Sequence, residues 1–266
     1  MARSGILAAA ILLTCAALVA QPKTQLRPET VAAYEKYAAR VEQNLDQQLS
    51  GDANFFLAGS NGKGWREQVR AGVVEPRATE RSLEVKGGLI QDWTATMFVR
   101  GAAGEDVIAL LTDYDHHKDV YPEVIDSKLV RRNGARIHSS LRLLKEKVFT
   151  VVLDTEHDVE VLTKADGRWQ LRSRSTRINE IRDAGKPKEV MLPEGKDSGF
   201  LWRLNAYWSI QEGDGGTYVE CRSVTLTRGV PFGLGWIVKP FTLSLPRDSL
   251  KATLDATKRT LLERAD

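Results

Sequence analysis

The segment Trp93-Thr-Ala-Thr-Met-Phe-Val99, followed by Arg100-Gly101 and by Glu105-Asp-Val-Ile-Ala-Leu-Leu-Thr112, decides the fold expected for this chain. Residues 93, 95, 97 and 99 would share one face of an extended chain, and this alternation predicts a strand. The apolar residues of 105–112 fall on one helical stripe. Acidic residues occupy the first turn of that helix, where the helix dipole favours anions. The main domain therefore opens with a strand, a break and a short helix.

Alternating hydrophobic residues dominate the chain from residue 136 to residue 227. This pattern predicts strands at 137–144, 147–157, 169–181, 200–211 and 217–227, with a long loop rich in Gly and Pro at 183–198. A last helix is expected from Pro246, capped by Ser244, with a buried stripe made by Leu250, Leu254, Thr257 and Leu261. The expected fold is α+β: a curved antiparallel sheet wrapped around a long C-terminal helix, with an N-terminal helical extension.

Residues 1–20 have the pattern of a signal peptide. Arg3 precedes an apolar run at 6–20, which is shorter than the roughly 20 residues of a membrane-spanning helix. Cleavage after Ala20 would make the protein exported, periplasmic or secreted. Two alternatives are a lipid anchor at Cys15, because residues 12–15 resemble a lipobox, and an uncleaved anchor. After cleavage Cys221 is the one remaining cysteine, so no intramolecular disulfide is expected.

Residues 21–87 are expected to form an N-terminal extension, and residues 88–266 the main domain. Pro28 suits the first turn of a helix. Apolar residues at 34, 38, 41, 45 and 49 form one stripe of that helix, and Gly51 ends it. This stripe predicts a helix packed against the main domain; a lid or a partner-binding helix is the alternative. Residues 54–88 are rich in glycine and charge and predict a loop, with a joint at 59–64.

A hairpin is predicted around the turn Asp214-Gly215. That turn sets residue 208 opposite 221, 206 opposite 223 and 204 opposite 225. The inner face would mix large indoles with small polar side chains. This pattern fits either a filled core or a lined cavity. The residues assigned to the inner face are Trp202, Leu204, Ala206, Trp208, Ile210, Val219, Cys221, Ser223 and Thr225.

Residues 105–115 and the motif Tyr121-Pro-Glu-Val124 resemble the opening of START-like domains, a superfamily that includes polyketide-cyclase and coenzyme Q-binding branches. Segments 152–158, 173–177 and 199–205 resemble a secreted bacterial branch of that superfamily. The resemblance covers residues 88–262 and implies a helix-grip fold with a cavity between sheet and helix. It also implies that the apolar segment 229–241 is a loop at the cavity mouth. Phe232 and Trp236 would touch a ligand or a membrane there, or else tuck beneath the last helix.

Charged residues alternate along two neighbouring predicted strands. Acids at 154, 156 and 158 share one face, and residues 155 and 157 share the other. Cross-strand pairs between these acids and Arg174 or Arg177 are the simplest explanation of the pattern. As an alternative, Arg174 or Arg177 points inward and holds an anionic headgroup.

The sequence carries no motif that would assign an enzyme activity. It has no glycine-rich phosphate loop, no Cys/His cluster with metal-ligand spacing, and no paired nucleophile and base that the spacing identifies. Its formal net charge of +3 is scattered over the chain, so binding of nucleic acid is not expected.

The expected function is therefore an exported, non-enzymatic binder or carrier of a hydrophobic small molecule such as a lipid or isoprenoid, with transient membrane contact and no cofactor or metal. The alternatives are an aromatase/cyclase-like enzyme that uses the same pocket and a structural module with a filled core. The residues expected to bind ligand are Trp202, Leu204, Trp208, Cys221, Ser223, Thr225, Phe232, Trp236, Arg174 and Arg177.

Overall fold

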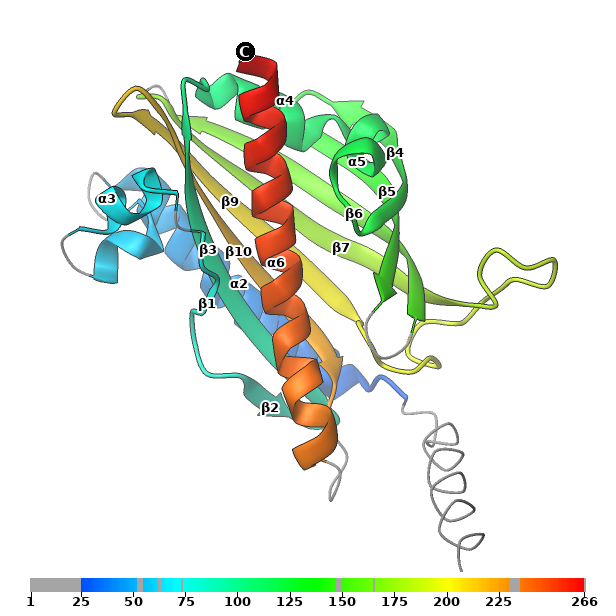
Figure 1. The fold of residues 1–266 in the computed structure, drawn as a ribbon. Coiled ribbons are helices and arrows are strands. Elements are labelled where there is room, and N and C mark those ends of the chain that lie inside the picture. Colours follow the sequence, from blue (N-terminus) through cyan, green and yellow to red (C-terminus); the bar gives the residue numbers. More distant parts are fainter. Residues whose placement is uncertain are drawn as a thin grey trace, which may run out of the picture.

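The computed structural model describes residues 25–51, 55–61, 64–72, 74–146, 150–164, 166–229 and 235–265, excluding the side chains of residues 60, 61, 235–243 and 265. Figure 1 shows the arrangement of its elements. The helices are α2 (Pro28–Ser50), η1 (Leu57–Asn61), α3 (Trp65–Arg70), α4 (Gly104–Thr112), η2 (Tyr114–His116), α5 (His117–Val120) and α6 (Gly235–Ala265). The strands are β1 (Arg77–Ala78), β2 (Leu83–Val85), β3 (Gly88–Arg100), β4 (Val124–Asn133), β5 (Arg136–Glu146), β6 (Thr150–Lys164), β7 (Arg168–Arg182), β8 (Val190–Met191), β9 (Arg203–Gly213) and β10 (Gly216–Arg228).

One antiparallel sheet contains all the strands of the described chain. Its order is β1-β3-β10-β9-β7-β6-β5-β4, while β2 pairs with β3 and β8 pairs with β7. The sheet curves around α6, which crosses its inner face (Figure 1). The predicted α+β fold with a sheet wrapped around the C-terminal helix is confirmed.

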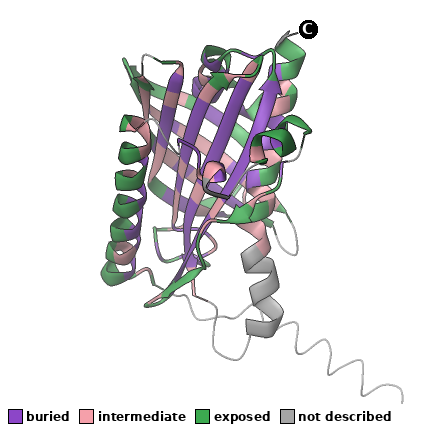
Figure 2. Ribbon diagram, turned by 90° about the vertical axis from the view of Figure 1, so that its left-hand side faces the viewer, coloured by how far each residue is buried: buried purple, intermediate pink, exposed green. Residues whose placement is uncertain are grey.

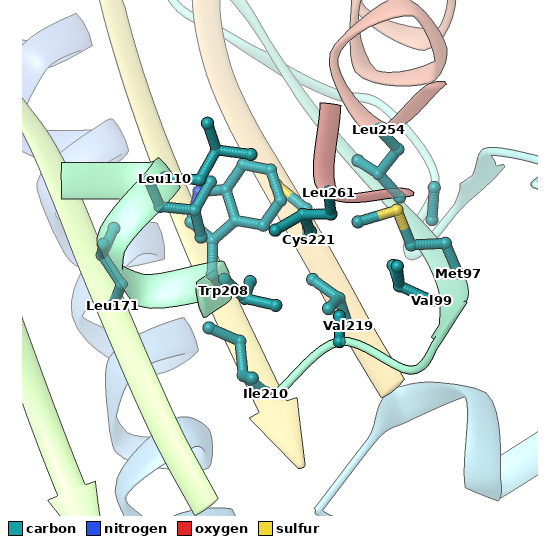
Figure 3. Close-up of a cluster of buried hydrophobic side chains, with 14 of the residues drawn as sticks. Met97, Val99, Leu110, Leu171, Trp208, Ile210, Val219, Cys221, Leu254 and Leu261 are labelled. Atoms are coloured by element: carbon teal, nitrogen blue, oxygen red, sulfur yellow. The ribbon is translucent and has the colours of Figure 1, made fainter. Parts of the chain in front are cut away.

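The inner face and α6 enclose the largest hydrophobic core. Met97 and Val99 of β3 contribute to it, together with Leu110 of α4 and Leu254 and Leu261 of α6. Figure 3 shows these side chains meeting Trp208 and Cys221 from the hairpin. Period-two alternation in β3 and the stripe predicted for the last helix are both confirmed, since Leu250, Leu254, Thr257 and Leu261 are buried.

The outer face of the sheet is covered by α2. Tyr34, Val41 and Leu45 of this helix pack against Tyr207 of β9 and Leu226 of β10 in a second core. Figure 2 shows the sheet as a buried layer with α2 on one side and α6 on the other. The predicted packing helix is confirmed, and it ends at Gly51 as expected.

Ion pairs and hydrogen bonds fix α2 to the sheet. Arg222 and Asp92 form a buried pair with an Nε–Oδ1 distance of 3.0 Å, and the Tyr37 hydroxyl donates to Asp92 Oδ2 at 2.7 Å. Glu42 of α2 accepts two hydrogen bonds from the Arg174 guanidinium at 2.5 and 2.9 Å. These ion pairs and this hydroxyl contact therefore join α2 to the sheet through matched charges and hydrogen bonds.

The register of the β9–β10 hairpin is the one that the sequence predicted. Trp208 lies opposite Cys221, and the residue pairs 206/223 and 204/225 also match. Asp214 and Gly215 both adopt positive φ, as the tight turn requires.

The start of the last helix was predicted wrongly. It begins at Gly235, before Pro246, so part of the segment that was expected to be a loop is helical. Residues 230–234 lie outside the described part of the chain.

Candidate ligand-binding site

A cavity of about 1010 Å³ lies between the inner face of the sheet and α6. Leu171 of β7, Leu204 and Trp208 of β9, and Leu250 of α6 form parts of its apolar wall. Small side chains contribute to this space: Ala206 and Ser223 lie opposite each other on β9 and β10, and both line the cavity. The arrangement suits a mostly apolar ligand.

Five of the predicted ligand-binding residues line this cavity. They come from facing positions of β9 and β10, which alternation directs toward α6. These residues are Leu204, Trp208, Cys221, Ser223 and Thr225.

Trp202 does not line the cavity, so the prediction that it shares the face of Trp208 is wrong. It lies fully buried in the core beneath α2. The strand begins only at Arg203, so alternation does not extend back to residue 202. Its indole Nε1 donates to Asp197 Oδ1 at 2.9 Å, an interaction that holds the ring on the outer side. Leu201 takes the cavity-facing place instead.

The two predicted arginines also lie outside the cavity lining. Arg174 pairs with Glu42 of α2, and Arg177 donates to Glu156 of the neighbouring strand. A bulge explains the position of Arg177: residue 156 pairs with 177 and residue 157 with 175, so Thr176 is an extra residue. The cross-strand pair expected for Arg177 is confirmed, whereas the partner of Arg174 comes from the N-terminal helix.

Two further predicted residues stay predictions. Phe232 lies outside the described residues. Trp236 belongs to α6, but its side chain is not among those described. Gly229, just before this segment, does line the cavity.

The cavity reaches the surface at one end of the strands, where Lys196 and Ser198 line it and are exposed. Because neighbouring strands are antiparallel, the last residues of β5, β7 and β10 all lie at this end of the sheet. Their charged side chains, together with residues from neighbouring turns, form a rim. The charged lining residues are Glu123, Lys145, Glu180, Arg182, Lys196, Asp197 and Arg228.

An ion pair and two hydrogen bonds connect α6 to the cavity wall at this rim. Lys145 of β5 pairs with Glu123 and donates to Ser249 Oγ of α6 at 2.6 Å. Ser249 in turn donates to Glu123 Oε1 at 3.1 Å. Because the three groups come from separate elements, the contact fixes the helix relative to the sheet near the opening.

Away from the rim, aromatic and imidazole side chains that were not among the predicted ligand-binding residues line the cavity. The ring of His117 lies between those of Tyr114 and Tyr121, with centroid distances of 4.4 and 5.0 Å. Burial lowers the pKa of His117 to about 4, although its hydrogen bond to the Leu110 carbonyl works in the opposite direction. His117 is therefore neutral at pH 7.

His157 is a second buried imidazole in the wall. Burial, with a smaller effect of His138, lowers its pKa to about 4. The sequence carried a signal for it: alternation had placed residues 155 and 157 opposite the acid row. If the acids face water, Thr155 and His157 must face inward.

Two polar side chains of the hairpin complete the interior wall. Thr225 is 5% exposed, and its hydroxyl has no hydrogen-bond partner within the described ranges. Burial raises the pKa of the Cys221 thiol, which keeps it protonated. The polar groups deep in the cavity are thus neutral, in contrast to the charged rim.

Among the residues described, no cluster of His, Cys, Asp and Glu is arranged to hold a metal ion. No helix in that part of the chain combines the length and apolar character needed to cross a membrane.

No family model and no curated protein matches the chain. Solved structures similar to it include a STAR-related lipid transfer protein of Xanthomonas axonopodis, with 17% identity over 67% of this chain and 96% of that chain and a TM-score of 0.47. A START superfamily protein of Mycobacterium smegmatis has 13% identity over 65% of this chain and 97% of that one, with a TM-score of 0.43. The Zhui aromatase/cyclase of a Streptomyces species has 15% identity over 66% and 93% of the two chains, with a TM-score of 0.41.

The fold is a helix grip. The chain's own topology carries this assignment: an antiparallel sheet that opens with β3, continues through short helices, and closes around a long C-terminal helix. The fold expected from residues 105–115 and 121–124 is therefore confirmed, and the activity is a separate question.

Proposed function

We propose that this protein is an exported binder or carrier of a hydrophobic small molecule, held between the sheet and α6. A lipid or an isoprenoid fits the wall, which is made mainly of leucine, tryptophan and small residues. The ligand would enter at the charged rim, where exposed Lys196 and Ser198 line the opening.

One observation carries the proposal: a cavity of about 1010 Å³ interrupts the inner core. Protein interiors are normally packed with few voids larger than a water molecule. A space of this size, lined by apolar side chains and reaching the surface, is the typical form of a small-molecule site. It argues against the structural module with a filled core.

The test is native mass spectrometry of protein purified from a bacterial periplasm, followed by solvent extraction of the bound material. Ala206 lies in the wall between Ser173 and Ser223. Replacing it, Ala206→Phe, places a ring in the cavity, so the extra mass should disappear or fall strongly in occupancy.

A matched control adds the same ring elsewhere. Thr163 is exposed on β6, so Thr163→Phe should keep the bound mass. Equal occupancy in a folded Ala206→Phe protein would contradict the proposal, as would a wild-type protein that neither carries nor takes up any lipophile.

Export and membrane contact are further parts of the proposal. The apolar run at 6–20 supports cleavage after Ala20, and the mature N-terminus can be read by mass spectrometry. Val190 and Met191, which form β8, are exposed, and the next residue, Leu192, lines the cavity. This supports transient contact with a membrane, which flotation with liposomes would measure.

A cyclase-like enzyme is the second candidate, and His157 favours it. His157 Nδ1 lies 3.3 Å from Ser173 Oγ, so a proton from a ligand that folds inside the cavity would reach the imidazole through the Ser173 hydroxyl. The two candidates differ in one readout: a carrier returns an added ligand unchanged, whereas an enzyme returns a product.

A further inference from the structure

A chain of hydrogen bonds runs from the cavity wall into the sheet through Ser173, His157 and Thr155. Ser173 Oγ lies 3.3 Å from His157 Nδ1, and His157 Nε2 lies 3.0 Å from Thr155 Oγ1. Ser173 and His157 line the cavity, and Thr155 is buried behind them. These hydrogen bonds form one continuous series, so the direction of each bond constrains the direction of the next.

The hydrogen bond that Thr155 makes at the buried end of the series fixes the direction of the other two. Thr155 Oγ1 donates its one hydrogen to the Leu141 carbonyl at 3.1 Å. Thr155 must then accept from His157, which places the imidazole hydrogen on Nε2. A neutral imidazole has one N–H, so Nδ1 is an acceptor and takes the hydrogen of Ser173. The 3% exposure of His157 is consistent with a neutral ring.

This arrangement decides what Ser173 presents to the cavity. A serine hydroxyl has one hydrogen to donate and two acceptor sites. The hydrogen of Ser173 is held by His157, so only lone pairs remain for a ligand. The Tyr114 hydroxyl interacts with Ser173 as well, but it can occupy no more than one of those acceptor sites. Ser173 is therefore an acceptor that favours ligands with a hydrogen to donate.

A second polar group of the wall, Thr225, can also meet a ligand. Thr225 lies on the same face of the sheet, is buried, and has a hydroxyl without a hydrogen bond in the described chain. A buried unsatisfied hydroxyl is destabilising unless a ligand or water meets it. Both groups are neutral, and the charged lining residues lie at the rim. The interior thus suits an uncharged polar group.

We propose that the cavity selects a lipophilic alcohol, whose hydroxyl donates to Ser173 Oγ while its apolar body lies against the wall. An ether or ketone of the same skeleton has no hydrogen to offer, and a carboxylate would bring a charge into a neutral interior. This inference rests on the proposed function and names the class of ligand for the same cavity.

The experiment compares geranylgeraniol with its methyl ether, using titration calorimetry on the full-length mature protein. The alcohol should bind about three- to tenfold more tightly, the factor expected for one added hydrogen bond. Ser173→Ala should abolish this preference by weakening the alcohol alone. Ser140→Ala is the matched control, because Ser140 lies on β5 beside Glu156, on the face opposite the cavity, and the preference should persist.

A second variant tests the direction of the hydrogen bond between Ser173 and His157. His157→Phe removes the acceptor for the Ser173 hydrogen and so allows Ser173 to donate. The ether should then bind more tightly than it binds to the wild-type protein. An ether affinity that stays unchanged in the folded variant would overturn the assignment of Ser173 as a fixed acceptor.

The remaining outcomes separate this inference from the proposed function. Equal binding of alcohol and ether by the wild-type protein overturns the alcohol preference but leaves a hydrophobic binder. A preference that survives Ser173→Ala overturns the role of Ser173. Failure to bind either compound, combined with no lipid on the purified protein, overturns both proposals.

Discussion

The two faces of one sheet carry different kinds of buried polar group: paired charges on the outer face and neutral groups on the inner face. On the outer face, beneath α2, Arg222 and Asp92 form a buried ion pair and Arg174 is matched by Glu42. On the inner face, the Thr225 hydroxyl has no hydrogen-bond partner among the described residues, and His157 is buried as a neutral ring. Satisfied polar groups stabilise a fixed contact, whereas unsatisfied neutral ones beside a cavity remain available to a ligand. The outer face therefore holds α2 in a fixed contact, whereas the inner face has the neutral polar groups that the proposed binding function requires.

The largest effect expected on this contrast comes from Trp202→Ala. This change empties a fully buried indole from the core beneath α2 and should lower the free energy of unfolding by about 3–5 kcal/mol. Ligand occupancy of the folded protein should persist, because Trp202 is outside the cavity lining. Urea unfolding and native mass spectrometry measure the two quantities. Loss of ligand from a well-folded variant would contradict the separation of the two faces.

The next largest effect is expected from acidification, which should lower the free energy of unfolding through two buried histidines of the inner face. His117 and His157 have pKa values of about 4 in the folded protein, below the ordinary 6.5. The unfolded chain therefore binds more protons between these values, and stability falls as the pH drops from about 6.5 to about 4. The maximum loss is about 3 kcal/mol for each histidine.

The measurement is the urea-unfolding free energy as a function of pH. His157→Asn removes one titrating group while keeping a donor and an acceptor, so its pH profile should be shallower than that of the wild-type protein. Identical profiles for the two proteins would show that His157 does not titrate between the folded and unfolded states as described.

A smaller effect is expected from Glu42→Gln on the outer face. This change weakens the hydrogen bonds to Arg174 and to the Tyr207 hydroxyl, which lies 3.0 Å from Glu42 Oε1. Because the Arg174 side chain is partly exposed, the expected loss is about 1 kcal/mol, with ligand binding retained. A shift of the thermal midpoint without any change in ligand occupancy would support the comparison, and altered occupancy would argue against it.

The smallest effect is expected from Arg177→Ala. Its pair with Glu156 is exposed to solvent, and such pairs contribute about 0–1 kcal/mol. Neither stability nor binding should change measurably. A strong loss of affinity for an anionic lipid would instead restore the headgroup role considered from the sequence.

Much of the fold could be predicted because local signals agreed with one another. The alternation in β3, the stripe of α2 and the Asp214-Gly215 turn each specify one arrangement, and the hairpin register followed from the turn. The same register correctly placed five residues of the cavity wall on the inner face of the hairpin.

The errors arose where backbone irregularity breaks a periodic pattern. Residue 202 lies before the strand begins, and an extra residue at Thr176 moves Arg177 to the outer face. Alternation placed the imidazole of His157 on the inner face, but spacing does not identify its two partners, Thr155 on the same strand and Ser173 on the neighbouring strand. Packing between elements, rather than periodicity within one, determines such sites.

Cys221 gives the cavity a built-in chemical reporter. It lines the ligand site, is the free cysteine of the described chain, and burial keeps its thiol protonated. Alkylation requires the thiolate and access for the reagent, so labelling will be slow and will depend on whether the cavity is occupied. The rate at which a small apolar maleimide reacts can therefore follow loading and release without any engineered probe. The same burial keeps the protonated thiol, enclosed by the sheet and α6, from forming a disulfide between two copies of the protein.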